Sequence, residues 1–223
     1  FFGFFAHAGV VSVLEEENLR PTQLTGCSAG ALIGGLWASG CRMDDLTEFL
    51  FSLQRSDFWD PSFGWGLLAG RRFDDILRGL LHCTTFEQTE IPIQMTVFDI
   101  AARKAEYLES GDLALAIRAS CAFPGLFQPV KIGQQSFLDG GILDRSGLGG
   151  LHHGGRVLYH RLKSRSKLRL ARPQLNTVVP PLEVVELCID KLPRVSPFHL
   201  ERGRDAYAHA REEMKRKLDA CCD

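Results

Sequence analysis

A serine flanked by two glycines is the first feature of this chain that could do chemistry. In the stretch LTGCSAGALIGGLWASG, Gly26, Ser28 and Gly30 fit the GxSxG pattern of a nucleophilic elbow. The serine of such an elbow sits on a sharp turn between a strand and a helix, and the glycines remove side chains that would clash there. The alternative is that these small residues, with Gly34 and Gly35, only let a helix pack closely.

A serine hydroxyl needs a neighbouring base before it can act as a nucleophile. Asp139 ends the apolar pattern QSFL and precedes Gly140 and Gly141, which allow a sharp turn and the close approach of another backbone. A carboxyl group shielded from water there would have a raised pKa and be a better base. Taken alone, the DGG stretch is more typical of a hairpin turn. A histidine could serve instead, and the histidines that follow Ser28 are His82, His152, His153, His160, His199 and His209.

Four stretches, in this order, resemble the patatin-like phospholipases, a family of lipid acyl hydrolases: FAHAGVVSVLEEENL, GCSAGALIGGLWASG, AIRASCAFPGLFQPV and FLDGG. The resemblance covers residues 5 to 145. It implies an α/β fold of three α/β/α layers with a mostly parallel central sheet. It also implies a Ser/Asp dyad in which Ser28 is the nucleophile and Asp139 takes its proton. Ser120 and Phe123 would then belong to the wall of the site.

The activity implied by this resemblance is hydrolysis of fatty-acyl esters of phospholipids or related lipids through an acyl-enzyme. No metal and no organic cofactor is expected, and the expected partner is a phospholipid or another acyl lipid, with no nucleic acid. Two alternatives remain open at this point. One is a Ser-His-Asp esterase, and the other is a lipid-binding or interaction module that has the fold without the catalysis.

The start of the chain departs from the family pattern. The family builds its oxyanion hole from a glycine-rich loop just before the helix that carries FAHxG, and each such donor is typically worth about 3 kcal/mol. Here Gly3 matches the last glycine of that loop, and Phe4 stands where the family has a further glycine. We therefore expect the oxyanion donors at Gly3 and Phe4. The expected organisation is a single patatin-like domain over residues 1–223, whose N-terminal strand and glycine-rich loop would precede Phe1.

Strands interleaved with helices favour a layered α/β fold, and nothing in the chain resembles a repeat or a low-complexity linker. Apolar periodicity predicts helices over residues 6–19, 28–39, 44–54, 73–82, 112–119, 182–189 and 197–219. Strands are predicted just before Ser28, over residues 91–98, and within KAEYLES, FQPVKIG, QSFLDGG, RVLYHRL and NTVVPP.

Residues 156–172 contain seven basic residues and no acidic one. Five of them would share one face of a strand because they alternate with other residues: Arg161, Lys163, Arg165, Lys167 and Arg169. Such a stripe could attract anionic lipid headgroups, each cation contributing about 1 kcal/mol. The alternative is an edge strand whose charges protect it from aggregation.

Aromatic residues crowd a second stretch, DFWDPSFGWGLLAG, at residues 57–70. Proline and glycine interrupt it, which is typical of a loop. Trp59 and Trp65 could contact lipid at the lip of an acyl pocket or at a membrane interface. Packing of these aromatics on the core is the alternative.

Composition limits the remaining classes. A chain of 223 residues with 45% apolar content can bury the core of one domain. The net charge of −1 implies no general attraction to nucleic acid. Seven cysteines, an odd number with no CxxC pair, favour a reducing compartment, so we expect a cytoplasmic protein that associates with a membrane surface. No apolar run is long enough for a transmembrane helix.

Overall fold

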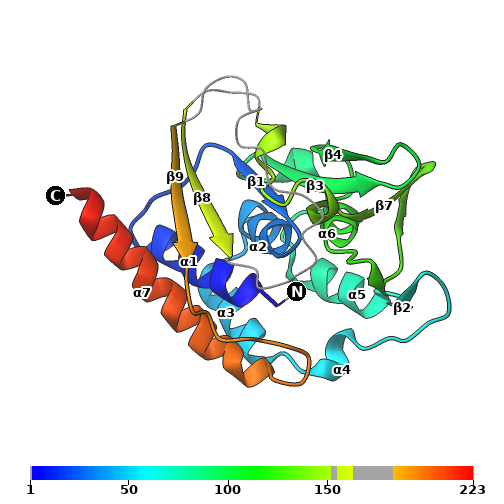
Figure 1. Cartoon of the computed structure of the whole chain (residues 1–223), viewed down its shortest axis with the longest axis horizontal. Coiled ribbons are helices and arrows are strands. Elements are labelled where there is room, and N and C mark those ends of the chain that lie inside the picture. The colour runs from blue at the N-terminus through cyan, green and yellow to red at the C-terminus, as the bar shows by residue number, and fades with distance from the viewer. Residues whose placement is uncertain (1, 152–154, 163–182, 223) are drawn as a thin grey trace.

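The computed structural model describes residues 2–151, 155–162 and 183–222. A central sheet of five strands is flanked by helices, with a two-stranded unit beside it (Figure 1). The five strands are β1 (Leu24–Cys27), β3 (Ile93–Asp99), β4 (Lys104–Leu108), β6 (Val130–Ile132) and β7 (Gln135–Asp139). The helices are α1 (Phe4–Glu16), α2 (Ala29–Ala38), α3 (Met43–Ser52), α4 (Arg55–Phe58), α5 (Arg71–Leu80), α6 (Leu113–Ser120) and α7 (Gly203–Cys222).

The layered α/β class expected from the sequence is confirmed. Parallel pairs join β1 to β3, β2 (Gly66–Leu68) to β5 (Gly125–Phe127), and β8 (Arg156–Leu162) to β9 (Glu183–Ile189). In the central sheet, β4 and β7 pair with β3 antiparallel, and β6 pairs with β7 antiparallel. The β3–β4 and β6–β7 connections are too short for the crossover that a parallel pair requires, so these two pairs form hairpins and the sheet is mixed.

Strand β3 organises the sheet because three strands pair with it. Strand β4 runs along one edge, opposite residues 95–99. The other edge is shared end to end: β1 lies opposite residues 93–96, and β7 lies opposite residues 97–99. Because β1 runs parallel to β3 and β7 runs against it, the carboxyl ends of β1 and β7 meet.

Helices α2 and α6 pack against the sheet and against each other. The small residues of α2 allow this approach: a Cβ on Gly35 would lie 2.8 Å from both Ile117 of α6 and Met95 of β3. A Cβ on Gly34 would lie 3.3 Å from Ile93. The packing role predicted for Gly34 and Gly35 is therefore confirmed, most strongly for Gly35.

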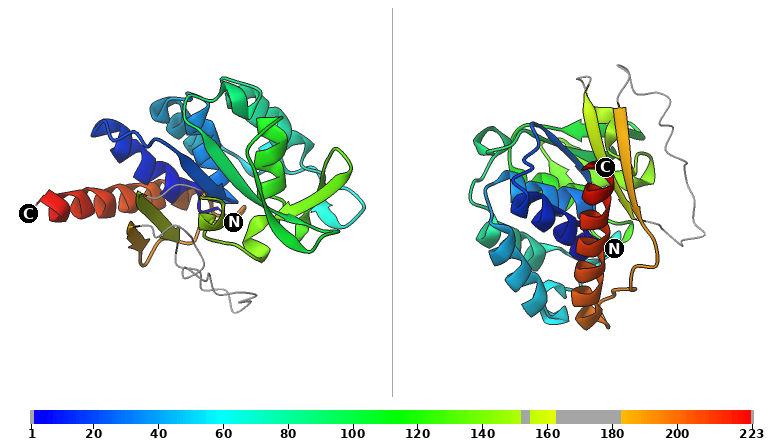
Figure 2. Two further views of the ribbon diagram at one scale, coloured as in Figure 1. Left: turned by 90° about the horizontal axis from the view of Figure 1, so that it is seen from above. Right: turned by 90° about the vertical axis from the view of Figure 1, so that its left-hand side faces the viewer.

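The two-stranded sheet of β8 and β9 lies against the pair of helices α1 and α7. Figure 2 shows α7 running alongside α1. One buried apolar cluster joins α1, β9 and α7. It contains Val10 and Val13 from α1, Leu187 and Ile189 from β9, and Met214 from α7.

The helix predicted at residues 182–189 is wrong, because β9 occupies that segment. The segment EVVELCI buries alternate residues near its end, and its full length pairs with β8. Periodicity alone does not distinguish a helix from a strand in so short an apolar run. Pairing with β8 therefore determines that it is a strand.

The other predicted helices are present with shifted ends. The final one begins as α7 at Gly203, preceded by a short 3-10 turn at Leu200–Arg202, and α1 ends at Glu16. The sequence did not indicate α4 as a separate helix or β2 as a strand. The strand predicted in NTVVPP lies outside the described residues. In the part of the chain that the structure describes, no helix combines the length and apolar character needed to cross a bilayer.

Candidate active site

Ser28 lies at the end of β1, directly before the first residue of α2, as the elbow pattern predicts. Its backbone has φ 54° and ψ −120°, a region that residues with a side chain rarely occupy. Such strain persists only where the surrounding structure imposes it, and it is concentrated at functional sites. The turn therefore has the sharp geometry that a nucleophilic elbow requires.

The two glycines of the elbow contribute unequally. A Cβ on Gly26 would lie 2.7 Å from the Ala31 backbone nitrogen, so the strand and the helix can meet here only with glycine. A Cβ on Gly30 would have no atom within 4 Å among the described residues. The steric role expected for both glycines therefore holds for Gly26, whereas the described structure leaves room for a side chain at position 30.

Asp139 is brought to Ser28 by the shared edge of β3. Cys27 pairs with Thr96, and Asp139 pairs with the next residue of β3, Val97. The Ser28 side chain lies beside the Asp139 carboxyl group, which is 4% exposed, and is close enough to lower its pKa. A Cβ on Gly140 would collide with the carbonyl oxygen of Thr96, so the first glycine of DGG is what lets the chain turn there.

Burial raises the pKa of the Asp139 carboxyl group. The nearby Ser28 hydroxyl opposes that rise, as does the Gly141 N–H, which donates to Oδ1 over 2.8 Å. The Cys27 thiol also faces Oδ1 at 3.9 Å, and burial raises the pKa of that thiol, which keeps it neutral. A carboxylate in these surroundings is a stronger base than one in water.

Residues at the end of α6 form hydrogen bonds with both the N–H and the carbonyl of Ser28. The Ser28 N–H donates to Ser120 Oγ over 2.9 Å, and the Ser120 hydroxyl donates to the Thr96 carbonyl over 2.8 Å. The Cys121 thiol donates to the Ser28 carbonyl over 3.2 Å. Ser120 is fully buried, whereas Phe123 is 48% exposed. Ser120 is thus a link between β3 and the strained serine, a role that its sequence context did not reveal.

An apolar pocket opens beside Ser28 and runs among the helices. Apart from Ser28 and Cys121, its walls are apolar, and they come from α1, α2, α3, α4, α5 and β5. Leucine and phenylalanine supply most of the lining, and its phenylalanines are Phe2, Phe4, Phe49, Phe58, Phe73 and Phe127. Such a lining suits a hydrocarbon chain, with the serine hydroxyl placed where the chain would meet its polar end.

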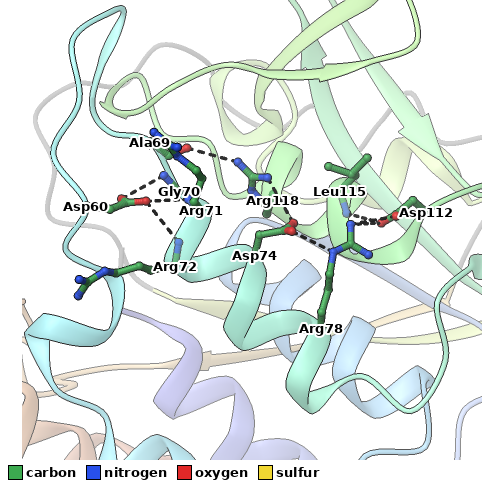
Figure 3. Close-up of polar contacts among 10 residues, drawn as sticks. All are labelled: Asp60, Ala69, Gly70, Arg71, Arg72, Asp74, Arg78, Asp112, Leu115 and Arg118. Atoms are coloured by element: carbon green, nitrogen blue, oxygen red, sulfur yellow. Dashed lines mark hydrogen bonds and ion pairs between the residues drawn. The ribbon is translucent and has the colours of Figure 1, made fainter.

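The α5 wall of this pocket is fixed by charged residues on its outer side (Figure 3). Asp74 of α5 pairs with Arg118 of α6 at 3.3 Å and with Arg78 at 2.9 Å. Arg78 also bridges to Asp112, whose carboxylate accepts the N–H of Leu115 in the first turn of α6. Helices α5 and α6 are therefore tied together beside the pocket.

The predicted oxyanion residues lie close to the elbow. Gly3 caps the N-terminus of α1, and a Cβ built on it would lie 3.8 Å from the Cβ of Ala29, the residue after Ser28. Phe4 begins α1, and its buried side chain lines the pocket. Free backbone N–H groups point outward at the start of a helix. The assignment of oxyanion donors to Gly3 and Phe4 stays a prediction.

The described histidines that follow Ser28 have contacts elsewhere. His160 faces His7 at 3.0 Å, His199 faces Glu201 at 3.3 Å, and His209 faces the carbonyl of Asp190 at 3.0 Å. His82 is exposed. His152 and His153 lie outside the described residues.

The sequence-predicted lipid contacts are dispersed. Arg161 forms an ion pair with Glu186 of β9, so its charge is compensated. Lys163, Arg165, Lys167 and Arg169 lie outside the described residues. Trp59 is half-buried, and the Arg55 guanidinium carbon lies over it, 4.1 Å from the centre of the Trp59 ring. Trp65, in contrast, is 83% exposed.

Comparisons with known proteins agree with this architecture. The family model described as patatin-like phospholipase matches residues 1–152, most of the chain, and the chain belongs to this family. An uncharacterized NTE family protein of Mycobacterium tuberculosis is 34% identical over 144 residues, which cover 63% of this chain and 40% of that protein. Lysophospholipase nte1 of Emericella nidulans is 29% identical over 156 residues, covering 62% of this chain and 10% of its own length. The chain thus corresponds to 40% or less of each of these relatives.

A solved structure supports the fold. The crystal structure of VipD from Legionella pneumophila superposes with a TM-score of 0.68 at 13% identity, covering 98% of this chain and 65% of VipD. Identity this low speaks for a shared fold and carries no information about substrate.

Proposed function

We propose that this protein is a serine acyl hydrolase that cleaves fatty-acyl esters of phospholipids or related lipids with a Ser/Asp dyad. One observation carries the proposal: the strained Ser28 lies beside the buried Asp139 carboxyl group and lines an apolar pocket. The nucleophile, its base and a chain-binding surface thus converge at one place. The name of the Emericella relative, a lysophospholipase, supports a substrate of this class.

The proposed reaction begins when the acyl chain enters the pocket and its ester carbonyl reaches Ser28. Asp139 takes the proton of Ser28 Oγ as that oxygen attacks the carbonyl carbon. Backbone N–H groups near Gly3 and Phe4 stabilise the negative charge on the carbonyl oxygen. As the intermediate collapses, the ester bond breaks and the leaving alcohol takes the proton from Asp139, which leaves the acyl group on Ser28.

Deacylation reverses the roles with water as the nucleophile. Asp139 takes a proton from a water molecule as the water oxygen attacks the acyl carbonyl. The bond to Ser28 Oγ then breaks, Oγ recovers the proton, and the fatty acid leaves. The raised pKa of Asp139 suits both halves of the cycle, because the group must accept and then return a proton near neutral pH.

The test is hydrolysis of a phospholipid and labelling by a fluorophosphonate probe. Ser28→Ala and Asp139→Asn should each lower turnover by about a thousandfold or more, and both should lose labelling. The matched controls are Ser136→Ala, a half-exposed serine on β7, and Asp75→Asn, an exposed carboxylate on α5; both should retain activity. Full activity in either dyad variant would refute the proposal.

The two alternatives give different results in the same assays. A Ser-His-Asp esterase predicts that replacing one of the six histidines after Ser28 abolishes turnover, whereas the Ser/Asp dyad predicts that no single histidine change does. A lipid-binding module without catalysis predicts a wild-type protein that binds lipid, stays unlabelled at Ser28 and releases no fatty acid.

A further inference from the structure

The segment between α4 and α5 holds apolar side chains in solvent. It projects at the side of the molecule opposite the C-terminus in both Figure 1 and the left view of Figure 2. Phe63 is fully exposed, Trp65 is 83% exposed and Leu67 is 47% exposed, whereas Leu68 of the same segment is buried. We call Phe63, Trp65 and Leu67 the apolar tip. Large apolar side chains that are exposed close together on a surface are typical of an interaction site.

The backbone of the apolar tip is held in place. Gln128, just after β5, accepts the Trp65 N–H at 2.9 Å and donates to the Gly66 carbonyl at 2.6 Å and to Ser62 Oγ at 3.3 Å. The Ser62 N–H donates to the Leu67 carbonyl over 2.9 Å, and β2 pairs with β5. The tip is thus presented by fixed polar contacts, so little conformational entropy remains to be lost when it binds a surface.

The base of the tip is anchored as firmly and presents two arginines. Asp60 accepts the N–H groups of Gly70, Arg71 and Arg72 at 2.7 to 3.3 Å, which fixes the start of α5 (Figure 3). Residues 61–72, PSFGWGLLAGRR, contain two arginines and no acidic residue. Arg71 and Arg72 are exposed beside the tip. An apolar tip flanked by cations is complementary to a membrane surface that carries anionic headgroups.

The same segment is continuous with the pocket wall. Phe58 comes just before it and Phe73 just after it, and both line the pocket that begins at Ser28. Phe127 of β5 lines that pocket too, on the strand that pairs with β2. A tip seated in the headgroup region would therefore bring one wall of the pocket to the membrane.

We propose that the apolar tip, flanked by Arg71 and Arg72, docks this protein on an anionic phospholipid bilayer. The choice of a bilayer rests on the proposed function, because a lipid hydrolase must reach substrate that resides in a membrane. The chemistry of the surface supports the same choice through two exposed aromatic side chains and two exposed arginines in the same segment.

The test is cosedimentation of the full chain with vesicles of phosphatidylcholine and phosphatidylserine in equal parts. Phe63→Ser combined with Trp65→Ser should weaken binding by about tenfold or more, since two aromatic side chains no longer leave water. Leu19→Ser, which removes another exposed apolar side chain just past the C-terminal end of α1, is the matched control and should bind as the wild type does. Arg71→Gln with Arg72→Gln should weaken binding several-fold on these vesicles and leave binding to pure phosphatidylcholine unchanged.

Tryptophan fluorescence reports where contact occurs. The chain has three tryptophans; Trp37 is buried and Trp59 is half-buried. Vesicles should therefore shift the emission of Trp65 to shorter wavelength. Trp65→Phe should retain vesicle binding and lose most of that shift.

Three results would overturn the docking proposal. The first is a wild type that fails to bind vesicles, and the second is tip variants that bind them as well as the wild type does. The third is a dimer of this protein that the Phe63 and Trp65 substitutions dissociate. Hydrolysis of a water-soluble short-chain ester separates this proposal from the proposed function. The tip variants should retain that hydrolysis. If no ester is hydrolysed but vesicle binding still depends on the tip, the proposed function fails and the docking surface stands.

Discussion

At the scale of single residues, the site depends on how one strained serine is held. Ser28 adopts a positive φ, and its neighbours fix it from three directions: its side chain meets Asp139, its N–H meets Ser120 and its carbonyl meets Cys121. Gly26 adds the close approach of strand and helix. Ser28 is therefore held by contacts from the end of β7 and from the end of α6.

We expect Ser120→Ala to lower kcat by about tenfold or more with little change in KM, because the Ser28 N–H loses its acceptor inside the protein and that loss costs about 1–3 kcal/mol. Ser12→Ala is the matched control, since Ser12 is also a buried serine but bonds Gly9 and Arg211 away from the site. Steady-state kinetics on a soluble ester measures the effect. A Ser120 variant with unchanged kcat would show that the elbow holds its shape without this bond.

At the scale of elements, the contact between α1 and β8 contains two facing histidines. His7 of α1 and His160 of β8 lie 3.0 Å apart, nitrogen to nitrogen. Burial lowers the pKa of His7 to about 4. Burial also lowers the pKa of His160, and the nearby His7 lowers it further. The folded protein thus keeps both rings neutral where an unfolded chain would bind protons.

Acid should therefore weaken this contact. The unfolded state takes up protons at His7 and His160 below about pH 6.5, while the folded state does not, so the free energy of unfolding should fall as pH drops from about 6.5 toward 4. For His7 alone the loss approaches about 3 kcal/mol at the acid end. Thermal melts across this range measure it.

Replacing both histidines by leucine should flatten that pH dependence. His199→Leu changes an exposed histidine and should leave it in place. An equally steep loss of stability in the His7/His160 double variant would show that other groups govern the response.

At the scale of the whole molecule, the pocket is a joint product of several helices and one strand. The residues that line it range from Phe2 near the start of the chain to Phe127 on β5. No single sequence motif therefore predicts the pocket. The pocket, the elbow and the apolar tip form one continuous arrangement around α5, which is tied to α6 by Arg118 and Arg78.

Narrowing this pocket should change chain-length preference. Ile76 of α5 lines the pocket and is half-buried, so Ile76→Trp should lower kcat/KM for long-chain esters by about tenfold relative to a butyrate ester, since bulk added to a packed pocket displaces the far end of a long chain first. Leu19→Trp adds the same ring at an exposed site and should leave the ratio unchanged. An unaltered ratio in the Ile76 variant would place the acyl chain elsewhere.

Much of this protein follows from its sequence because local rules suffice. The elbow was predictable, since strand, glycines, serine and helix are contiguous around Ser28. The helices α1, α2, α3, α5, α6 and α7 and the strands β3, β4 and β7 followed from periodicity and turn residues. The family followed from four stretches whose order and content are specific, and the match over residues 1–152 confirms it.

Tertiary structure decided what depends on distant segments. Residues 183–189 form a strand because β8 is there to pair with them, and Arg161 is an ion-pair partner because Glu186 lies beside it. Trp59 and Trp65 are alike in sequence, yet one is covered by Arg55 and the other is held in solvent by Gln128. Ser28 meets Asp139 because β1 and β7 share one edge of β3 in opposite directions. Sequence specifies the chemistry a residue can do, and packing specifies which partner it meets.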